Sequence, residues 1–181
     1  MGRELRADPE GGVHHVSNRG ARQYTTFIDD VDRRSFLDLV GTAAVKHEIS
    51  VLAYCLMGNH YHLLVSCRSG GLSLFVHGFA SAYSRRFNRD HGFSGPLNGD
   101  RFWSGVVDGD DHLITVARYI HRNPVELGFD ARSYRWSSYR HYLQASGPDW
   151  LNRVPLLTAS GGRQALQRIV ECDVVDRRRH R

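Results

Sequence analysis

Apolar and polar residues repeat with two different periods along this chain, and the changes of period predict its elements. Runs with apolar side chains at alternate positions, or without a break, predict β-strands at residues 12–19, 49–56, 60–67 and 101–107. Apolar residues at helical spacing predict helices at residues 32–46, 72–89 and 112–122. A second short strand is expected near residues 25–28, and short helices near residues 137–143 and 163–170.

The order of the main elements is strand, helix, strand, strand, helix, strand, helix. The first six match the split βαβ arrangement of a ferredoxin-like fold. We therefore expect an α+β protein with a ferredoxin-like antiparallel sheet, helices on one face, and one added helix. Residues 1–11 are expected to be flexible, residues 12–145 to form the main domain, and residues 146–181 to form a C-terminal extension with a basic tail.

Length and composition agree with one domain that has an ordinary core. The chain has 181 residues, of which 41% are hydrophobic and 24% are charged. The longest uninterrupted apolar run, Val51 to Met57, is much shorter than the about 20 residues that span a membrane. The first residues also lack the apolar core of a secretory signal. We expect a cytoplasmic protein without a membrane partner.

The charge of the chain comes almost entirely from arginine. The net charge is +5, the pI is about 9.4, and Lys46 is the only lysine among 24 basic residues. Arginine binds phosphate through a planar fork of donors, so the bias favours a nucleic-acid partner, although a GC-rich genome would produce the same bias. The cysteines, Cys55, Cys67 and Cys172, have neither zinc-finger nor disulfide spacing, and the first two are expected to be buried.

Two histidines in the strand predicted at 60–67 are the first candidates for chemistry. His60 and His62 are separated only by Tyr61. Side chains alternate between the faces of a strand, so the two imidazoles point one way and the tyrosine points the other. Two imidazoles side by side can hold one metal ion, and a pair of surface histidines without a metal is the alternative.

A second group lies on the helix that follows the fourth strand. Tyr119 and Asn123 are four residues apart and share a helical face, beside the core stripe of Leu113, Ala117 and Ile120. The amide oxygen of Asn123 can supply a third ligand, and a mixed nitrogen and oxygen site with open positions suits Mg²⁺ or Mn²⁺. Tyr119 is either a nucleophile for metal-assisted attack or an amphipathic boundary tyrosine.

Other histidines and aromatic residues are expected mainly in the core. His14 and His15 point to opposite faces of the first strand, so one of them approaches the histidine pair if that strand is central. Tyr83 lies on the apolar stripe of its helix. An aromatic cluster is expected to pack the C-terminal segment onto the body, with base stacking as the alternative. Its members are Tyr134, Trp136, Tyr139 and Tyr142.

Four runs of this sequence resemble, in order, those of the REP-associated tyrosine transposases. These are bacterial, IS200-like members of the HUH superfamily of one-tyrosine, single-strand transposases. The resemblance extends over residues 12–143. The runs are Val13–Gly20, Ala53–Val65, Arg118–Val125 and Tyr134–Tyr139.

The resemblance implies an enzyme that cleaves and rejoins single-stranded DNA with the help of Mg²⁺ or Mn²⁺. It implies that Tyr119 forms a 5′-phosphotyrosine and that His60, His62 and Asn123 hold the metal. The implied partner is single-stranded DNA, either hairpin or repeat DNA, on which the protein acts in the nucleoid as a monomer or homodimer. The candidate DNA-binding residues are Arg19, Arg85, Arg86, Arg89 and Arg101, with the tail at 177–181.

The chain departs from the family pattern at two places. Gly58 stands where proline is usual, which loosens the turn before His60 but removes no ligand. Glu126 begins a stretch where a basic residue is common, which alters DNA contacts. Two other functions stay open: a hairpin DNA- or RNA-binding module without catalysis, and a metal-dependent phosphodiesterase that uses water while Tyr119 is structural.

Overall fold

Four strands form one antiparallel sheet in the computed structural model, which describes residues 11–21, 24–68, 70–144 and 146–172. The strands are β1 (Val13–Arg19), β2 (Ile49–Leu56), β3 (His60–Cys67) and β4 (Trp103–Val107). Their spatial order is β2-β3-β1-β4, and each neighbouring pair is antiparallel. This is the ferredoxin-like arrangement, so the predicted fold class is confirmed, with β1 and β3 at the centre.

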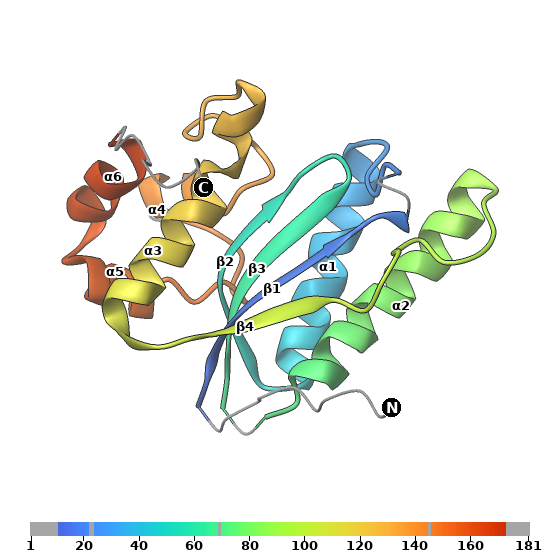
Figure 1. Ribbon diagram of the computed structural model, residues 1–181, viewed down its shortest axis with the longest axis horizontal. Coiled ribbons are helices and arrows are strands. Elements are labelled where there is room, and N and C mark those ends of the chain that lie inside the picture. Colours follow the sequence, from blue (N-terminus) through green and yellow to red (C-terminus); the bar gives the residue numbers. More distant parts are fainter. Residues whose placement is uncertain (1–10, 22–23, 69, 145, 173–181) are drawn as a thin grey trace, which may run out of the picture.

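Two long helices cover one face of the sheet (Figure 1). They are α1 (Asp30–Lys46) and α2 (Leu72–His91), which pack side by side. Their aromatic side chains Phe36, Phe75 and Phe79 are fully buried against the strands. The predicted helices at 32–46 and 72–89 are therefore confirmed, each with two further residues at one end.

The opposite face carries the helix that was predicted as an addition (Figure 1). This helix, α3 (Gly109–Arg122), continues directly into the 3₁₀ helix η2 (Asn123–Leu127). Three short helices lie on the same side: α4 (Tyr139–Gln144), α5 (Val154–Ser160) and α6 (Arg163–Glu171). Because α5 and α6 pack against α3, the described part of the C-terminal extension shares the core of this face.

The core of the α3 face confirms the predicted stripe of that helix. Leu113, Ala117 and Ile120 are all buried in one cluster with Leu64 of β3 and Cys55 of β2. The second predicted buried cysteine, at position 67, lies in the other core. Of the residues described, no helix combines the length and the apolar character that a membrane crossing requires.

The predicted short strand at residues 25–28 is wrong. The backbone N–H groups of Thr26 and Phe27 both donate to the carbonyl of Gly58, at 2.9 and 3.2 Å. Consecutive residues of a strand point their N–H groups to opposite sides, so two consecutive donors on one carbonyl make a loop and no ladder. Helix α5 was not predicted, because its seven residues contain a proline and are too few to reveal a helical period.

Candidate active site

Strand β3 presents the two histidines to the α3 face of the sheet. The ring centroids of His60 and His62 are 5.1 Å apart. Tyr61 points to the other face, where it is only 1% exposed in the core under α1 and α2. On the neighbouring strand β1, Arg19 pairs with His60 and Ser17 pairs with His62. The period of two residues therefore separates site from core along this strand, as the sequence predicted.

Helix α3 and its extension bring the tyrosine and the asparagine to the same place. The ring of Tyr119 lies 5.4 Å from that of His62, and the Tyr119 side chain is 43% exposed. Asn123 keeps helical backbone angles at the junction with η2, so it stays on the same face as Tyr119. Its Oδ1 lies 3.2 Å from Nε2 of His60. The predicted residues thus meet within a single chain.

These side chains line an open cleft of about 820 Å³ at one end of the sheet. The end of β1, the turn before β3, the start of β4 and the end of α3 with η2 form its walls. The lining residues are Ser17, Asn18, Arg19, Thr25, Met57, Gly58, Asn59, His60, His62, Arg101, Trp103, Tyr119, Asn123, Glu126 and Leu127.

The turn that delivers His60 is held from outside the cleft. Its Gly58 carbonyl accepts the two hydrogen bonds from the loop before α1 described above. On the other side, Gly20 N donates to the carbonyl of Asn59 at 2.9 Å. Met57 N also donates to the carbonyl of His60 at 2.8 Å. Backbone bonds from two separate segments therefore fix the direction in which β3 begins.

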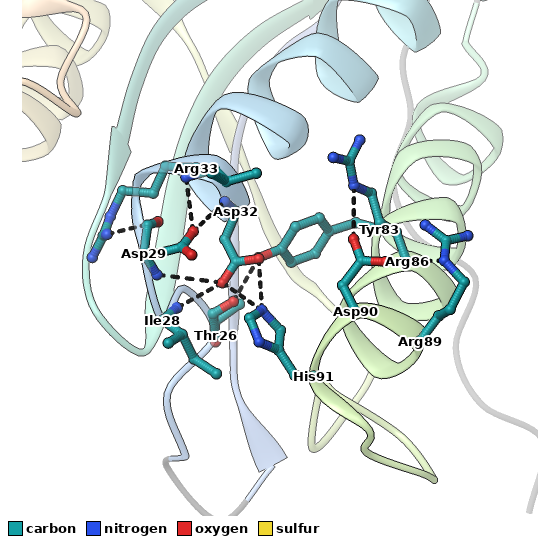
Figure 2. Close-up of polar contacts among 11 residues, drawn as sticks. Thr26, Ile28, Asp29, Asp32, Arg33, Tyr83, Arg86, Arg89, Asp90 and His91 are labelled. Atoms are coloured by element: carbon teal, nitrogen blue, oxygen red, sulfur yellow. Dashed lines mark hydrogen bonds and ion pairs between the residues drawn. The ribbon is translucent and has the colours of Figure 1, made fainter.

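A polar network holds the loop before α1 in turn (Figure 2). The buried carboxylate of Asp32 accepts a hydrogen bond from Ile28 N at 2.8 Å and lies 2.9 Å from Nε2 of His91, at the end of α2. The Tyr83 hydroxyl donates to the Thr26 carbonyl at 2.7 Å. Tyr83 is buried here, as predicted, and both helices under the sheet thereby brace the rim of the cleft.

Two arginines anchor α3 to α6. Arg118 donates through Nε to the carbonyl of Ile169 at 2.8 Å and through Nη2 to that of Cys172 at 2.7 Å. Arg122 donates to the carbonyl of Val170 at 2.8 Å. The carbonyls at a helix end otherwise have no helical partner, so these bonds fasten α6 to the helix that carries Tyr119. No pattern in the sequence indicated a structural role for these two arginines.

Burial keeps the histidines of the cleft neutral. Desolvation, assisted by nearby His15 and His60, lowers the pKa of His62 to about 3. Desolvation and the nearby His112 lower the pKa of His15 to about 4. Burial also lowers the pKa of His60. A neutral imidazole has one nitrogen lone pair available, which is the form that binds a metal.

The neighbours of His60 decide which of its nitrogens carries that lone pair. Its Nδ1 lies 2.8 Å from Oδ1 of Asn59, and an amide oxygen only accepts, so Nδ1–H donates. The lone pair is then on Nε2, which faces Oδ1 of Asn123 at 3.2 Å. Two acceptors that face each other repel unless a cation lies between them. Ligands at right angles around Mg²⁺, with bonds of about 2.1 Å, are separated by about 3 Å, so this pair fits such an ion.

His15 supplies the corresponding contact for the second histidine. Its Nε2 lies 2.9 Å from Nδ1 of His62, and β1 is central, so His15 is the histidine of its pair that approaches His60 and His62. When His62 donates through Nδ1 to His15, its Nε2 is left for a ligand, as in His60. Metal-binding histidines are commonly held by such a second hydrogen bond. The sequence left the choice between His14 and His15 open.

The potential ligand set remains a mixed one. The described residues contain no cluster of three His, Cys, Asp or Glu side chains placed to bind a metal. A third protein ligand would therefore be the amide oxygen of Asn123, whose side chain is 5% exposed. Two imidazoles and one amide leave several positions for water or substrate oxygens, which suits Mg²⁺ or Mn²⁺ better than a closed zinc site.

The predicted DNA-binding arginines fall into two groups. Arg19 and Arg101 line the cleft. Arg85, Arg86 and Arg89 lie on α2, under the opposite face of the sheet, and the last two pair with Asp90 at 3.2 and 2.9 Å (Figure 2). The basic tail at 177–181 lies outside the described residues. For all of these residues, contact with DNA stays a prediction.

The aromatic cluster near the C-terminus packs the chain together, as predicted. Tyr139 and Tyr142 are buried in the core of the α3 face. The Tyr134 hydroxyl donates to the carbonyl of Leu56 at 2.8 Å. One aromatic residue of the cleft was not singled out in the sequence: Trp103, at the start of β4, is 56% exposed.

The fold is therefore a ferredoxin-like sheet whose cleft contains one tyrosine and two histidines. The family model for "Transposase IS200 like" matches residues 13–123, so the chain belongs to the IS200-like transposase family. No sequence match was found among curated proteins.

A solved structure shows the same fold over most of the chain. A REP-associated tyrosine transposase bound to a REP hairpin superimposes with a TM-score of 0.69 at 12% identity, over 84% of this chain and 94% of the other. A candidate transposase from Deinococcus radiodurans gives a TM-score of 0.46 at 17% identity, over 67% of this chain and 95% of the other. The first match shows that the two proteins share a fold.

Proposed function

We propose that this transposase cuts and rejoins single-stranded DNA with Tyr119 as its nucleophile. The observation that carries the proposal is the position of Tyr119, which is half-exposed beside His62 in the cleft that also contains His60 and Asn123. The solved relative in complex with a REP hairpin supports hairpin DNA as the class of substrate.

The proposed step exchanges one phosphate ester for another. The Tyr119 oxygen attacks the scissile phosphorus, a bond from this oxygen to phosphorus forms, and the bond from phosphorus to the 3′ oxygen of the preceding nucleotide breaks. The products are a 5′-phosphotyrosine and a 3′-hydroxyl. The phenol proton passes to water in the open cleft, and water protonates the leaving oxygen. Attack by a 3′-hydroxyl reverses the step, so strand joining needs no nucleoside triphosphate.

The remaining residues of the cleft would bind and orient the phosphate. His60, His62 and Asn123 would hold Mg²⁺ or Mn²⁺, which, when bound, supplies positive charge that polarises the phosphorus and stabilises the transition state. His15 would keep His62 in the required tautomer through their contact of 2.9 Å. Arg19 and Arg101 would neutralise neighbouring phosphates, which makes affinity fall with rising salt.

Covalent trapping tests the proposal. Labelled single-stranded hairpin DNA is incubated with the protein and Mn²⁺, and the products are separated on a denaturing gel. Wild-type protein is expected to give a slow, protease-sensitive band, whereas Tyr119→Phe gives none and still binds DNA. Tyr24→Phe is the control, because Tyr24 is 65% exposed and does not line the cleft; this variant should keep the band.

Each other outcome identifies a different function. A band of equal strength from Tyr119→Phe would assign the nucleophile to another tyrosine. Cut DNA with free ends and no adduct would identify a phosphodiesterase that uses water. A complex on a native gel, with neither cleavage nor adduct, would identify a binding module.

A further inference from the structure

Trp103 is the largest exposed apolar side chain of the cleft. It lies at the first position of the edge strand β4, with its side chain on the α3 face, and 56% of it is exposed. A tryptophan ordinarily buries most of its large surface. An indole left open beside a candidate nucleophile therefore requires an explanation.

The strand is built to hold this indole in place. A Cβ atom at Gly105, two residues further along the same face, would lie 2.7 Å from Cη2 of Trp103. The ring thus leans back along β4 over the space that glycine leaves free. It also contacts the ring of His15 edge to face, with centroids 5.2 Å apart. Two contacts fix the ring, while more than half of its surface stays open.

His15 also relates the indole to the nucleophile. The same imidazole lies 5.2 Å from Trp103 on one side and 5.8 Å from Tyr119 on the other. One strand of DNA advances about 3.4 Å per stacked nucleotide, so the two rings are separated by about three nucleotides at most. Arg101, two residues before Trp103, lines the same cleft.

We propose that Trp103 is a stacking platform for one unpaired base of the DNA strand, within about three nucleotides of the phosphate that Tyr119 attacks. This inference rests on the proposed function, because it assigns the cleft to single-stranded DNA. Proteins that bind such strands combine a basic groove with aromatic rings on which bases stack. Here the arginines of the cleft would hold the backbone, while the indole would hold one base and so fix the register of the strand.

A flat ring selects for an unpaired base more than for its identity, since every base has a π-face. The interaction can therefore be measured before the natural target sequence is known. The probe is a DNA hairpin with a short single-stranded extension, in which each nucleotide of the extension is replaced in turn by an abasic site. Affinity is measured by fluorescence anisotropy with the Tyr119→Phe variant and without divalent metal, so that no cleavage occurs.

The expected result is one position at which the abasic site weakens binding about 5- to 100-fold, the range that base stacking on an aromatic ring provides. Trp103→Ala should weaken binding of intact DNA by the same factor and should show no further loss at that position. Trp103→Phe should restore part of the affinity. Gly105→Ala displaces the indole without removing it, so it should also abolish the position-specific loss.

Phe93→Ala is the matched control, because Phe93 is also 56% exposed and lies outside the cleft. It should retain the position-specific loss. The inference is overturned if the losses of affinity caused by the abasic site and by Trp103→Ala add independently, or if Trp103→Ala binds DNA as tightly as its parent. It is also overturned if Trp103→Ala changes the oligomeric state of the protein, because the indole would then lie in a subunit contact. If one abasic position depends on Trp103 but the wild type forms no covalent product with DNA, only the proposed function is refuted. If the wild type forms the covalent product but no abasic position depends on Trp103, only the stacking platform is refuted.

Discussion

The two faces of β3 differ in the side chains that they carry. Toward α1 and α2 the strand presents Tyr61, Leu63 and Val65, which are all fully buried. Toward α3 it presents His60, His62 and Leu64. The first face is a closed apolar core along its whole length. The second is a core only where α3 covers it, and becomes a polar cleft at the end of the helix. One face therefore supplies stability and the other exposes chemistry.

The difference shows how a small fold keeps polar groups near its centre. Buried imidazoles are costly unless their nitrogens are bonded. The contact of His60 Nδ1 to Asn59, and that of His62 Nδ1 to His15, provide such partners. Backbone hydrogen bonds to the rim, and not apolar packing inside the cleft, hold the walls of the cleft in place. Substitutions on the α1 and α2 face should therefore lower stability, whereas substitutions in the cleft should lower activity.

Neighbouring residues of β3 give the largest contrast. Tyr61→Ala should lower the free energy of unfolding by about 3–5 kcal/mol, as for other large aromatic truncations in a core. His60→Ala should change it by less than about 1 kcal/mol but lower the cleavage rate by about 1000-fold or more, since a metal contributes several kcal/mol to the transition state. Urea unfolding and single-turnover cleavage measure the two quantities. Equal losses of stability would refute the division between the faces.

The sequence predicts the local patterns behind this difference between the two faces, but not the contacts between distant segments. Alternation along β3 and the stripe of α3 follow from periods of two and 3.6 residues, so the strand faces and the meeting of Tyr119 with Asn123 were predictable. The roles of His15 and Arg118 were not, because each depends on which distant segment packs opposite, as in the bond of Arg118 to the carbonyl of Cys172. Tertiary partners that are far apart in sequence leave no local period.

Asn123 offers the next test of the cleft. Two arrangements fit its contact with His60: Oδ1 can share a metal with Nε2, or the rotated amide can donate a hydrogen bond from Nδ2. As a ligand, Asn123→Ala should raise the Mn²⁺ concentration for half-maximal cleavage by about 100-fold, comparable to the upper range for lost metal-site contacts. Asn123→Asp should keep or lower it, because carboxylate oxygen binds the ion well.

A titration of cleavage against Mn²⁺ for both variants separates the arrangements. If the two substitutions raise the requirement equally, the amide donates a hydrogen bond and is not a ligand. Melting temperatures supply the control. A large fall in Asn123→Ala without a change in metal dependence would give this residue only a structural role at the end of α3.

His15 should have a smaller effect, because it acts through His62. Removal of the bond between His15 Nε2 and His62 Nδ1 leaves the ligand in place but releases its tautomer and orientation. His15→Ala is therefore expected to weaken Mn²⁺ binding by about 10-fold, the lower range for outer contacts of metal ligands. Isothermal titration with Mn²⁺ measures this directly. Affinity equal to that of the wild type would show that the cleft does not need His15 to orient its partner.

The last prediction concerns stability at the rim of the cleft, where an added Cβ atom would meet different surroundings at two glycines. A Cβ at Gly58 meets no atom within 4 Å, and this residue does not have a positive φ angle. Gly58→Ala should therefore raise the free energy of unfolding by about 0.4–1 kcal/mol, because alanine restricts the unfolded chain. A Cβ at Gly20 would lie only 2.2 Å from the carbonyl oxygen of Tyr24, so Gly20→Ala should lower stability by about 1–3 kcal/mol.

Urea unfolding of the two variants tests this prediction, and cleavage assays extend it to the site. The turn at Gly58 leads directly into His60, so a stiffer turn should leave the Mn²⁺ requirement unchanged or slightly lower. Gly58 would then lower the stability of the protein without being required for cleavage. A loss of cleavage in Gly58→Ala, with stability increased, would mean instead that the turn must move when DNA enters the cleft.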